Sequence, residues 1–164
     1  MLLKFLLDED FVNYKKCSMF IGFPYCTFKC DKENNNRICQ NWTLTSQPNI
    51  EYPATKIVER YLENPLTTAI VCGGLEPFDS FNELFELIKE FRSKTNDDFV
   101  IYTGYDKEEV KEYVDILSKY DNIYIKFGRY IPNNQPHYDD VLGIYLASDN
   151  QYGEKINWGG EDGF

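Results

Sequence analysis

The stretch Thr67-Thr-Ala-Ile-Val-Cys-Gly-Gly-Leu-Glu-Pro-Phe78 contains an apolar run, a pair of glycines and a proline in quick succession. An uninterrupted apolar run is typical of a strand that is covered on both faces, and the glycines and proline mark its end. We predict this strand over residues 67–72, and working outward we find similar runs at residues 18–23, 99–103 and 122–127. Apolar residues at helical spacing separate these runs at residues 54–63, from Asp79 or Ser80 to about Ser93, and from Asp106 to about Lys119.

Repeated strand–helix units predict an α/β fold with a mostly parallel sheet, because right-handed crossovers bring successive strands side by side. We expect a single domain over residues 1–164, since no linker or internal repeat divides the chain. Residues 1–16 read as an N-terminal edge segment. Residues 139–147 form a fifth apolar run, and residues 152–164 read as a mobile tail.

The sequence has a formal net charge of −10 and no run of Lys and Arg interleaved with aromatic residues. Such a chain repels a phosphate backbone, which disfavours direct nucleic-acid binding. No stretch approaches the roughly 18 apolar residues of a membrane span, and the apolar start lacks the basic region and cleavage site of a signal peptide. We therefore expect a soluble, cytoplasmic protein that does not bind membranes.

Three cysteines, Cys26, Cys30 and Cys39, follow the first apolar run with the spacing Cys-x3-Cys-x8-Cys. They lie in a polar segment, residues 24–53, whose length is unusual in a compact domain unless the segment has a function. The chain has five cysteines, an odd number, which indicates metal ligation in a reducing compartment more than a disulfide framework. Three thiolates leave one iron of a four-iron cluster without a protein ligand, and chemistry can occur at such an open position.

Three local patterns fall at the carboxyl ends of the predicted strands, which is where ligands bind in parallel sheets. The cysteine loop follows the first strand, Gly73-Gly-Leu-Glu-Pro-Phe78 follows the second, and Tyr102-Thr-Gly-Tyr105 follows the third. Glycine lets a ligand approach the backbone, and Glu76 adds a carboxylate. Each of the two later patterns is also an ordinary turn, so the prediction of a site depends on their shared position.

A closed site of four thiolates, with Cys17 joining the loop cysteines, is the main structural alternative. Cys17 precedes the first strand, and about six strand residues at roughly 3.3 Å each separate it from the loop, which favours three ligands. Cys72 lies in an apolar strand and reads as a small buried side chain. The sole histidine, His137, is assigned no role.

Taken together, the cysteine loop with Cys39-Gln-Asn41, the Gly73-Gly-x-Glu-Pro77 segment and Tyr102-Thr-Gly-Tyr105 resemble radical S-adenosylmethionine (SAM) enzymes. Specifically, they resemble the small activases of anaerobic (class III) ribonucleotide reductase, over about Met19 to Gln151. Two later segments also look like that group: Ile125-Lys-Phe-Gly-Arg-Tyr130 and Ala147-Ser-Asp-Asn-Gln151. The chain departs from the family in two places, because Cys-x3-Cys-x2-Cys and Gly-Gly-Glu-Pro or Gly-Gly-Asp-Pro are the commoner patterns.

The resemblance implies a partial (βα) barrel of the radical SAM type, with a [4Fe–4S] cluster held by Cys26, Cys30 and Cys39. S-adenosylmethionine would chelate the fourth iron through its amino and carboxylate groups. The implied contacts of S-adenosylmethionine fall into two sets. The methionyl amino group would meet Gly73, Gly74 and Glu76, and the nucleoside would lie against the backbone near Thr103, Gly104 and Tyr105.

The activity that the resemblance implies is reductive cleavage of S-adenosylmethionine to a 5′-deoxyadenosyl radical. This radical would install a glycyl radical on the large subunit of an anaerobic ribonucleotide reductase, with a flavodoxin- or ferredoxin-like electron donor. Two alternatives stay open. One is a small-molecule radical SAM enzyme such as a deazapurine-forming synthase, and the other is a non-enzymatic cysteine–metal module with a structural or interaction role.

Overall fold

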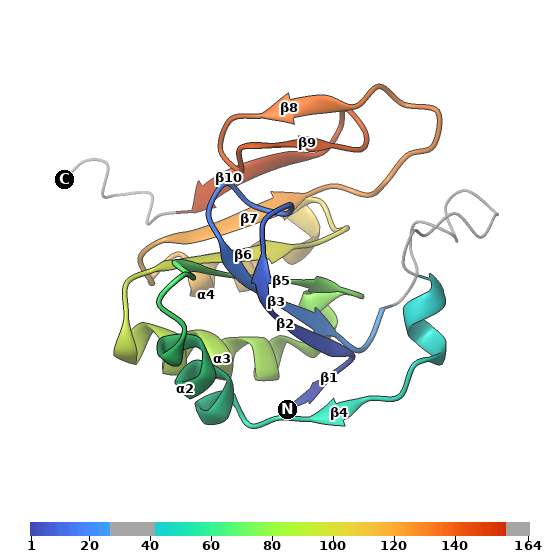
Figure 1. Cartoon of the computed structure of the whole chain (residues 1–164). Coiled ribbons are helices and arrows are strands. Elements are labelled where there is room, and N and C mark those ends of the chain that lie inside the picture. The colour runs from blue at the N-terminus through green and yellow to red at the C-terminus, as the bar shows by residue number, and fades with distance from the viewer. Residues whose placement is uncertain (27–41, 157–164) are drawn as a thin grey trace.

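The computed structural model describes residues 1–26 and 42–156, which are built around a six-stranded sheet in the order β10-β7-β6-β5-β3-β2 (Figure 1). The two edge strands pair antiparallel with their neighbours, and the four inner strands run parallel. The chain is therefore α/β with a mixed sheet, and the partial barrel stays a prediction. The strands are β2 (Phe5–Asp10), β3 (Ser18–Phe23), β5 (Ala69–Gly74), β6 (Asp98–Tyr102), β7 (Ile123–Phe127) and β10 (Tyr152–Ile156).

Three helices of the described residues cover one face of the sheet: α2 (Ala54–Glu63), α3 (Phe81–Lys94) and α4 (Lys111–Leu117). Figure 1 draws α2 and α3 below the sheet. Alternation along each strand sends every second side chain to this face, where it meets the apolar stripes of the helices. The resulting main core joins strand residues to helix residues, among them Ile21, Cys72, Ile101, Leu84 and Leu117. Burial of these apolar side chains is the principal stabilising term for the fold.

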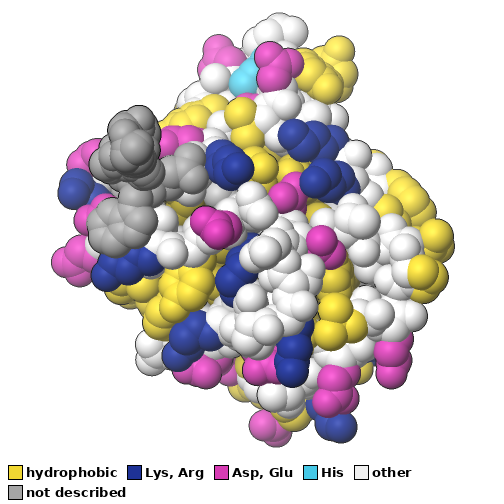
Figure 2. Space-filling view, turned by 90° about the vertical axis from the view of Figure 1, so that its left-hand side faces the viewer, with side chains coloured by type: hydrophobic (Ala, Val, Ile, Leu, Met, Phe, Trp, Pro, Cys, Tyr) yellow, Lys and Arg dark blue, Asp and Glu magenta, His cyan; other side chains and the backbone are white. Residues whose placement is uncertain are grey.

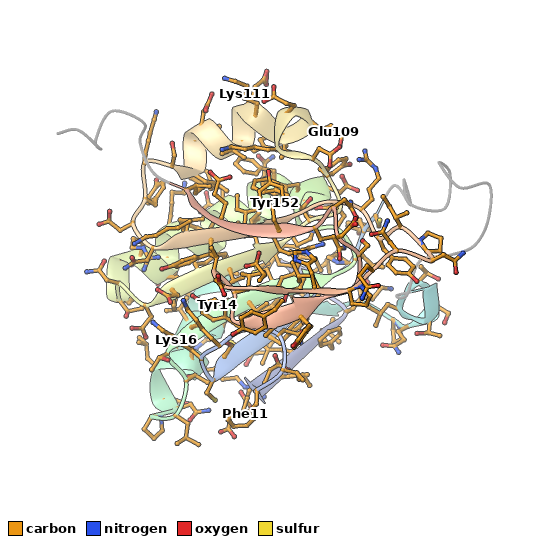
Figure 3. All side chains as sticks on the ribbon, turned by 90° about the horizontal axis from the view of Figure 1, so that it is seen from above. Phe11, Tyr14, Lys16, Glu109, Lys111 and Tyr152 are labelled. Carbon is orange, nitrogen blue, oxygen red and sulfur yellow. The ribbon has the colours of Figure 1, made fainter. Side chains whose placement is uncertain are left out.

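The opposite face is covered by a hairpin of β8 (His137–Asp139) and β9 (Ile144–Leu146), together with the connection between β2 and β3. Tyr14 from that connection lies against the sheet and donates a hydrogen bond to Asp98 at 2.8 Å. Phe11, which is 71% exposed, projects away from the sheet at the edge of the molecule (Figure 3). The second core cluster combines Tyr14, Ala69, Val71, Val100, Leu142 and Leu146.

The structure corrects one predicted boundary near the glycine pair and adds a turn after it. The second strand was predicted over residues 67–72, but β5 runs from Ala69 to Gly74 because its parallel pairing with β3 continues to the partners Phe23 and Gly74. Asp79 or Ser80 was predicted to cap the next helix, and α3 indeed begins at Phe81 with Ser80 as its N-cap residue, although the Ser80 side chain makes no capping hydrogen bond. A 3₁₀ turn that was not predicted, η2 (Pro77–Ser80), precedes this helix, and the Glu76 side chain caps it by accepting from the Phe78 N–H.

The predicted cap at Asp106 is confirmed, because Asp106 and Glu109 form a capping box. The helix begins with a 3₁₀ turn, η3 (Lys107–Val110), and α4 ends at Leu117 rather than near Lys119. Tyr120 donates its N–H to the Leu117 carbonyl, so the chain turns at this point instead of extending the helix.

The two ends of the chain differ in how well they were predicted. The N-terminal edge segment is confirmed in that β2 forms one edge of the sheet, while β1 (Leu2–Leu3) pairs with β4 (Ile50–Glu51). The prediction of a mobile tail from residue 152 is wrong for the first five residues, because Tyr152–Ile156 form β10 and pair with β7. Residues 157–164 lie outside the described part of the chain.

Charged side chains of both signs are interspersed on the face that Figure 2 shows, which is the end where the parallel strands begin. An ion pair at this end joins the exposed side chain of Lys16 to the buried Asp98, with Lys16 Nζ at 2.8 Å from the carboxylate. None of the helices in the described ranges combines the length and the apolar character of a membrane span.

Candidate functional site

The carboxyl ends of β3 and β5 are joined by backbone hydrogen bonds that continue beyond the strands. The Leu75 N–H donates to the Phe23 carbonyl at 3.1 Å, and the Glu76 N–H donates to the Tyr25 carbonyl at 2.7 Å. Cys26, which is half-buried, follows Tyr25 directly. The start of the cysteine loop and the Gly73–Glu76 segment are therefore adjacent, as their predicted positions at one edge of the sheet required.

Both glycines of the pair allow close approach of neighbouring groups. Gly74 has φ +78°, and a Cβ added there would lie 2.8 Å from Gly22 Cα and 2.9 Å from Phe23 N, both backbone atoms of β3. A Cβ added at Gly73 would lie 2.9 Å from the Phe20 ring. The pairing of β3 with β5 therefore requires glycine at position 74, independently of any ligand. The predicted contacts of Gly73 and Gly74 with S-adenosylmethionine stay a prediction.

Glu76 connects the second and third sequence patterns. Its carboxylate accepts hydrogen bonds from the Thr103 hydroxyl at 2.8 Å and from the Gly104 N–H at 2.9 Å. The residue is only 6% exposed. Burial raises the pKa of Glu76 to about 7, while the hydrogen bonds from Gly104, Phe78 and Thr103 act in the opposite direction. The structure thus brings Glu76 into direct contact with two of the other predicted site residues.

The segment after β6 is held on its other side by the segment after β7. The Tyr105 carbonyl accepts from the Gly128 N–H at 3.1 Å, and the Tyr105 hydroxyl donates to Asp79 at 2.6 Å. The Tyr105 N–H donates to Thr103 Oγ1 at 3.0 Å. Hydrogen bonds therefore run along the carboxyl edge of the sheet from Tyr25 to Gly128, across the ends of all four parallel strands.

The two late segments noted in the sequence also meet at this edge. The Gln151 side-chain amide donates to the Gly128 carbonyl at 3.3 Å, and the Asn150 side-chain amide donates to the Arg129 carbonyl at 2.9 Å. These bonds hold the turn before β10 against the turn after β7. Residues far apart in the sequence thereby form one continuous edge.

Lys126 is a residue of this region to which the sequence analysis gave no role. It lies in β7, is only 7% exposed and donates through Nζ to the Gly128 carbonyl at 3.1 Å. Its Nζ also lies 5.6 Å from the centroid of the Tyr102 ring. A lysine within the apolar run Ile123–Phe127 was the available signal, since a charged side chain in such a strand needs partners.

Of the three predicted cluster ligands, Cys26 lies at the carboxyl edge, and Cys30 and Cys39 fall outside the described residues. Cys17 precedes β3 at the opposite end of that strand, and burial together with Glu9 and Asp10 raises the pKa of its thiol. Burial likewise raises the pKa of Cys72, which is fully enclosed. A raised pKa disfavours the thiolate that binds metals. Within residues 1–26 and 42–156, no three Cys, His, Asp or Glu side chains gather as a metal site.

The fold and this edge define an α/β protein with a cysteine loop at the carboxyl end of a parallel strand, beside a glycine-containing strand end. The family model for the 4Fe-4S single cluster domain matches residues 15–146, and the chain belongs to this family. Searches against curated proteins and against solved structures give no significant match. The match spans the cysteine loop and all four parallel strands, so the chain is an iron–sulfur protein.

The cysteines of the chain fit a cluster of this kind, because thiolates are the usual ligands of iron in such clusters. All five cysteines fall within the matched residues. Cys72 is enclosed in the sheet and Cys17 lies at the opposite end of β3, so neither is placed to join Cys26. The three-thiolate set of Cys26, Cys30 and Cys39 stays the ligand prediction.

Proposed function

We propose that this chain is a radical SAM activase whose [4Fe–4S] cluster is held by Cys26, Cys30 and Cys39. Membership of the 4Fe-4S single cluster domain family supports the iron–sulfur cofactor. The observation that carries the proposal is the hydrogen-bonded edge that runs from Tyr25 through Glu76 to Thr103 and Gly104. A cofactor placed at this edge would be within reach of all three sequence patterns at once.

A reduced cluster held by Cys26, Cys30 and Cys39 would supply the single electron for reductive cleavage of a bound S-adenosylmethionine to methionine and a 5′-deoxyadenosyl radical. The part of the chain in this chemistry is to bind and orient. The methionyl end would lie near Gly73 and Gly74 at the end of β5, and the nucleoside would lie against the Thr103–Tyr105 backbone. Holding the reacting groups in a fixed geometry is the main contribution that a protein makes to such a step.

The proposed substrate is a backbone glycine in the large subunit of an anaerobic ribonucleotide reductase. The hydrogen atom would pass from the glycine Cα to the 5′ carbon, which leaves a glycyl radical and 5′-deoxyadenosine. A flavodoxin- or ferredoxin-like protein would supply the electron.

Cleavage of S-adenosylmethionine is the first expected result. After anaerobic reconstitution with iron and sulfide and reduction with dithionite, the chain should convert S-adenosylmethionine to 5′-deoxyadenosine and methionine in equal amounts. Chromatography of the quenched reaction measures both products, and omission of dithionite is the control. A chain that holds a full cluster but gives no 5′-deoxyadenosine would contradict the proposal.

The glycyl radical separates the activase from the small-molecule alternative. With the large subunit of an anaerobic ribonucleotide reductase present, the reduced and S-adenosylmethionine-loaded chain should generate a glycyl radical signal by electron paramagnetic resonance. The signal should be absent when the recipient glycine is replaced by alanine. Formation of 5′-deoxyadenosine with no radical on the reductase would instead favour a small-molecule substrate.

A further inference from the structure

We infer that Glu76 is a positioning residue: its buried carboxylate holds the segments after β5 and β6 together and acts on the cofactor site through them. The inference rests on the proposed function. It differs from the expectation that Glu76 contacts the methionyl amino group, because the carboxylate is engaged by the protein itself.

Three protein donors occupy the Glu76 carboxylate. Oε2 accepts from the Phe78 N–H at 3.0 Å and from the Thr103 hydroxyl at 2.8 Å, and Oε1 accepts from the Gly104 N–H at 2.9 Å. A carboxylate offers about four acceptor positions, so the protein fills most of them. A carboxylate that is only 6% exposed is costly unless it is hydrogen-bonded, and these three bonds offset that cost.

The hydrogen bonds between Glu76 and the segment after β6 are all donated by that segment and accepted by the carboxylate. Thr103 Oγ1 accepts from the Tyr105 N–H at 3.0 Å, which leaves the hydroxyl proton of Thr103 to be donated to Glu76. The Gly104 N–H points to the other carboxylate oxygen. Glu76 therefore orients the backbone of the three residues, Thr103 to Tyr105, that are proposed to border the nucleoside.

The backbone of Glu76 also links these segments to the residues that precede the cysteine loop. Its N–H donates to the Tyr25 carbonyl at 2.7 Å, one residue before Cys26. One residue thus links the ends of β3, β5 and β6. Leu75, the residue that the commoner Gly-Gly-Glu-Pro pattern lacks, continues the pairing with β3 through its bond to Phe23. The glutamate follows one position later, where its side chain reaches Thr103 and Gly104.

The variants Glu76→Gln, Thr103→Val and their combination test this role by a double-mutant cycle. Glutamine replaces one carboxylate oxygen by an amide donor, which leaves at least one of the three donors facing a donor. We expect Glu76→Gln to lower kcat/KM for S-adenosylmethionine cleavage by about 10- to 100-fold, the scale of a small misplacement of bound groups. Thr103→Val should lower it as well, and the double variant should be no worse than Glu76→Gln alone.

Two further measurements separate positioning from general loss of structure. Glu86→Gln changes an exposed glutamate of α3 that pairs with Lys89, and it should leave cleavage at the wild-type level. In Glu76→Gln with wild-type iron content, hydrogen exchange should speed up at the Gly104 amide and stay unchanged at amides of β6. If Glu76→Gln fails to fold, S-adenosylmethionine cleavage and the exchange rate of the Gly104 amide are measured in Thr103→Val instead. These two measurements then test whether Glu76 is a positioning residue.

Direct contact between Glu76 and the cofactor predicts the opposite pattern. Thr103→Val would then behave as wild type, the losses in the double variant would add, and exchange at Gly104 would not change. Wild-type cleavage in every variant would also overturn the inference. Failure of the wild-type chain to cleave S-adenosylmethionine is a separate result that removes the proposed function, and the exchange comparison still reports whether Glu76 restrains the β6 segment.

Discussion

The Cys39→Ser chain is expected to lose its iron–sulfur cluster, and Cys26→Ser and Cys30→Ser should lose it as well. With three protein thiolates for a four-iron cluster, removal of any one leaves two irons without a protein ligand. Even outer-shell changes cost about 10- to 100-fold in metal affinity, so loss of a direct ligand should exceed 100-fold. Iron and sulfide analysis after anaerobic reconstitution, with the visible absorbance of the cluster, measures the effect.

Cys17→Ser is the matched control for these variants and should keep a wild-type cluster. Cys17 lies just before β3 and Cys26 lies beyond its other end, so six strand residues at roughly 3.3 Å each separate them. A sulfur–metal bond of about 2.3 Å cannot span that length. Loss of the cluster in Cys17→Ser, or about one zinc per chain in the wild type, would indicate a closed structural site instead.

Gly74→Ala should have the largest effect on stability of any glycine substitution at the carboxyl edge. Alanine at φ +78° is strained, and its Cβ would meet backbone atoms of Gly22 and Phe23 that the strand pairing holds in place. We expect the free energy of unfolding to fall by about 2–4 kcal/mol, a large share of the ~5–15 kcal/mol of a typical domain. Urea unfolding followed by circular dichroism measures the change.

Gly73→Ala provides the comparison within the same pair. Its added Cβ would approach the ring of Phe20 at 2.9 Å, and a side chain can shift where a paired backbone cannot. The expected loss is therefore smaller, about 1 kcal/mol, in the lower part of the range for single substitutions. Equal losses at the two positions would contradict the close approach of β3 and β5 at Gly74.

Sequence patterns predicted the centre of the fold well, because the four inner strands are buried apolar runs separated by helical spacing. The predicted strand boundaries were wrong where long-range strand pairing overrides the local sequence signals. Gly73 and Gly74 read as a strand end, yet pairing with β3 keeps them in β5. Tyr152–Ile156 contains glycine and charged residues and read as a tail, yet pairing with β7 makes it an edge strand.

The candidate site was predictable in its location but not in its connections. Cys26, Glu76 and Thr103 each follow a strand, and the parallel order of those strands brings them to one edge. The direction of the Glu76 carboxylate depends on the register between β5 and β6, which a single sequence does not specify. Lys126 was missed for a related reason, since the Tyr102 ring comes beside it only through the pairing of β6 with β7.

Electron paramagnetic resonance of the reduced chain, with and without S-adenosylmethionine, tests the central claim most directly. That claim is a cluster held by three thiolates with one iron open to S-adenosylmethionine. We predict about four irons and four sulfides per chain and a reduced-cluster signal whose g-values shift when S-adenosylmethionine is added. A signal that S-adenosylmethionine leaves unchanged, in a chain with a full cluster, would show a closed site and contradict the account.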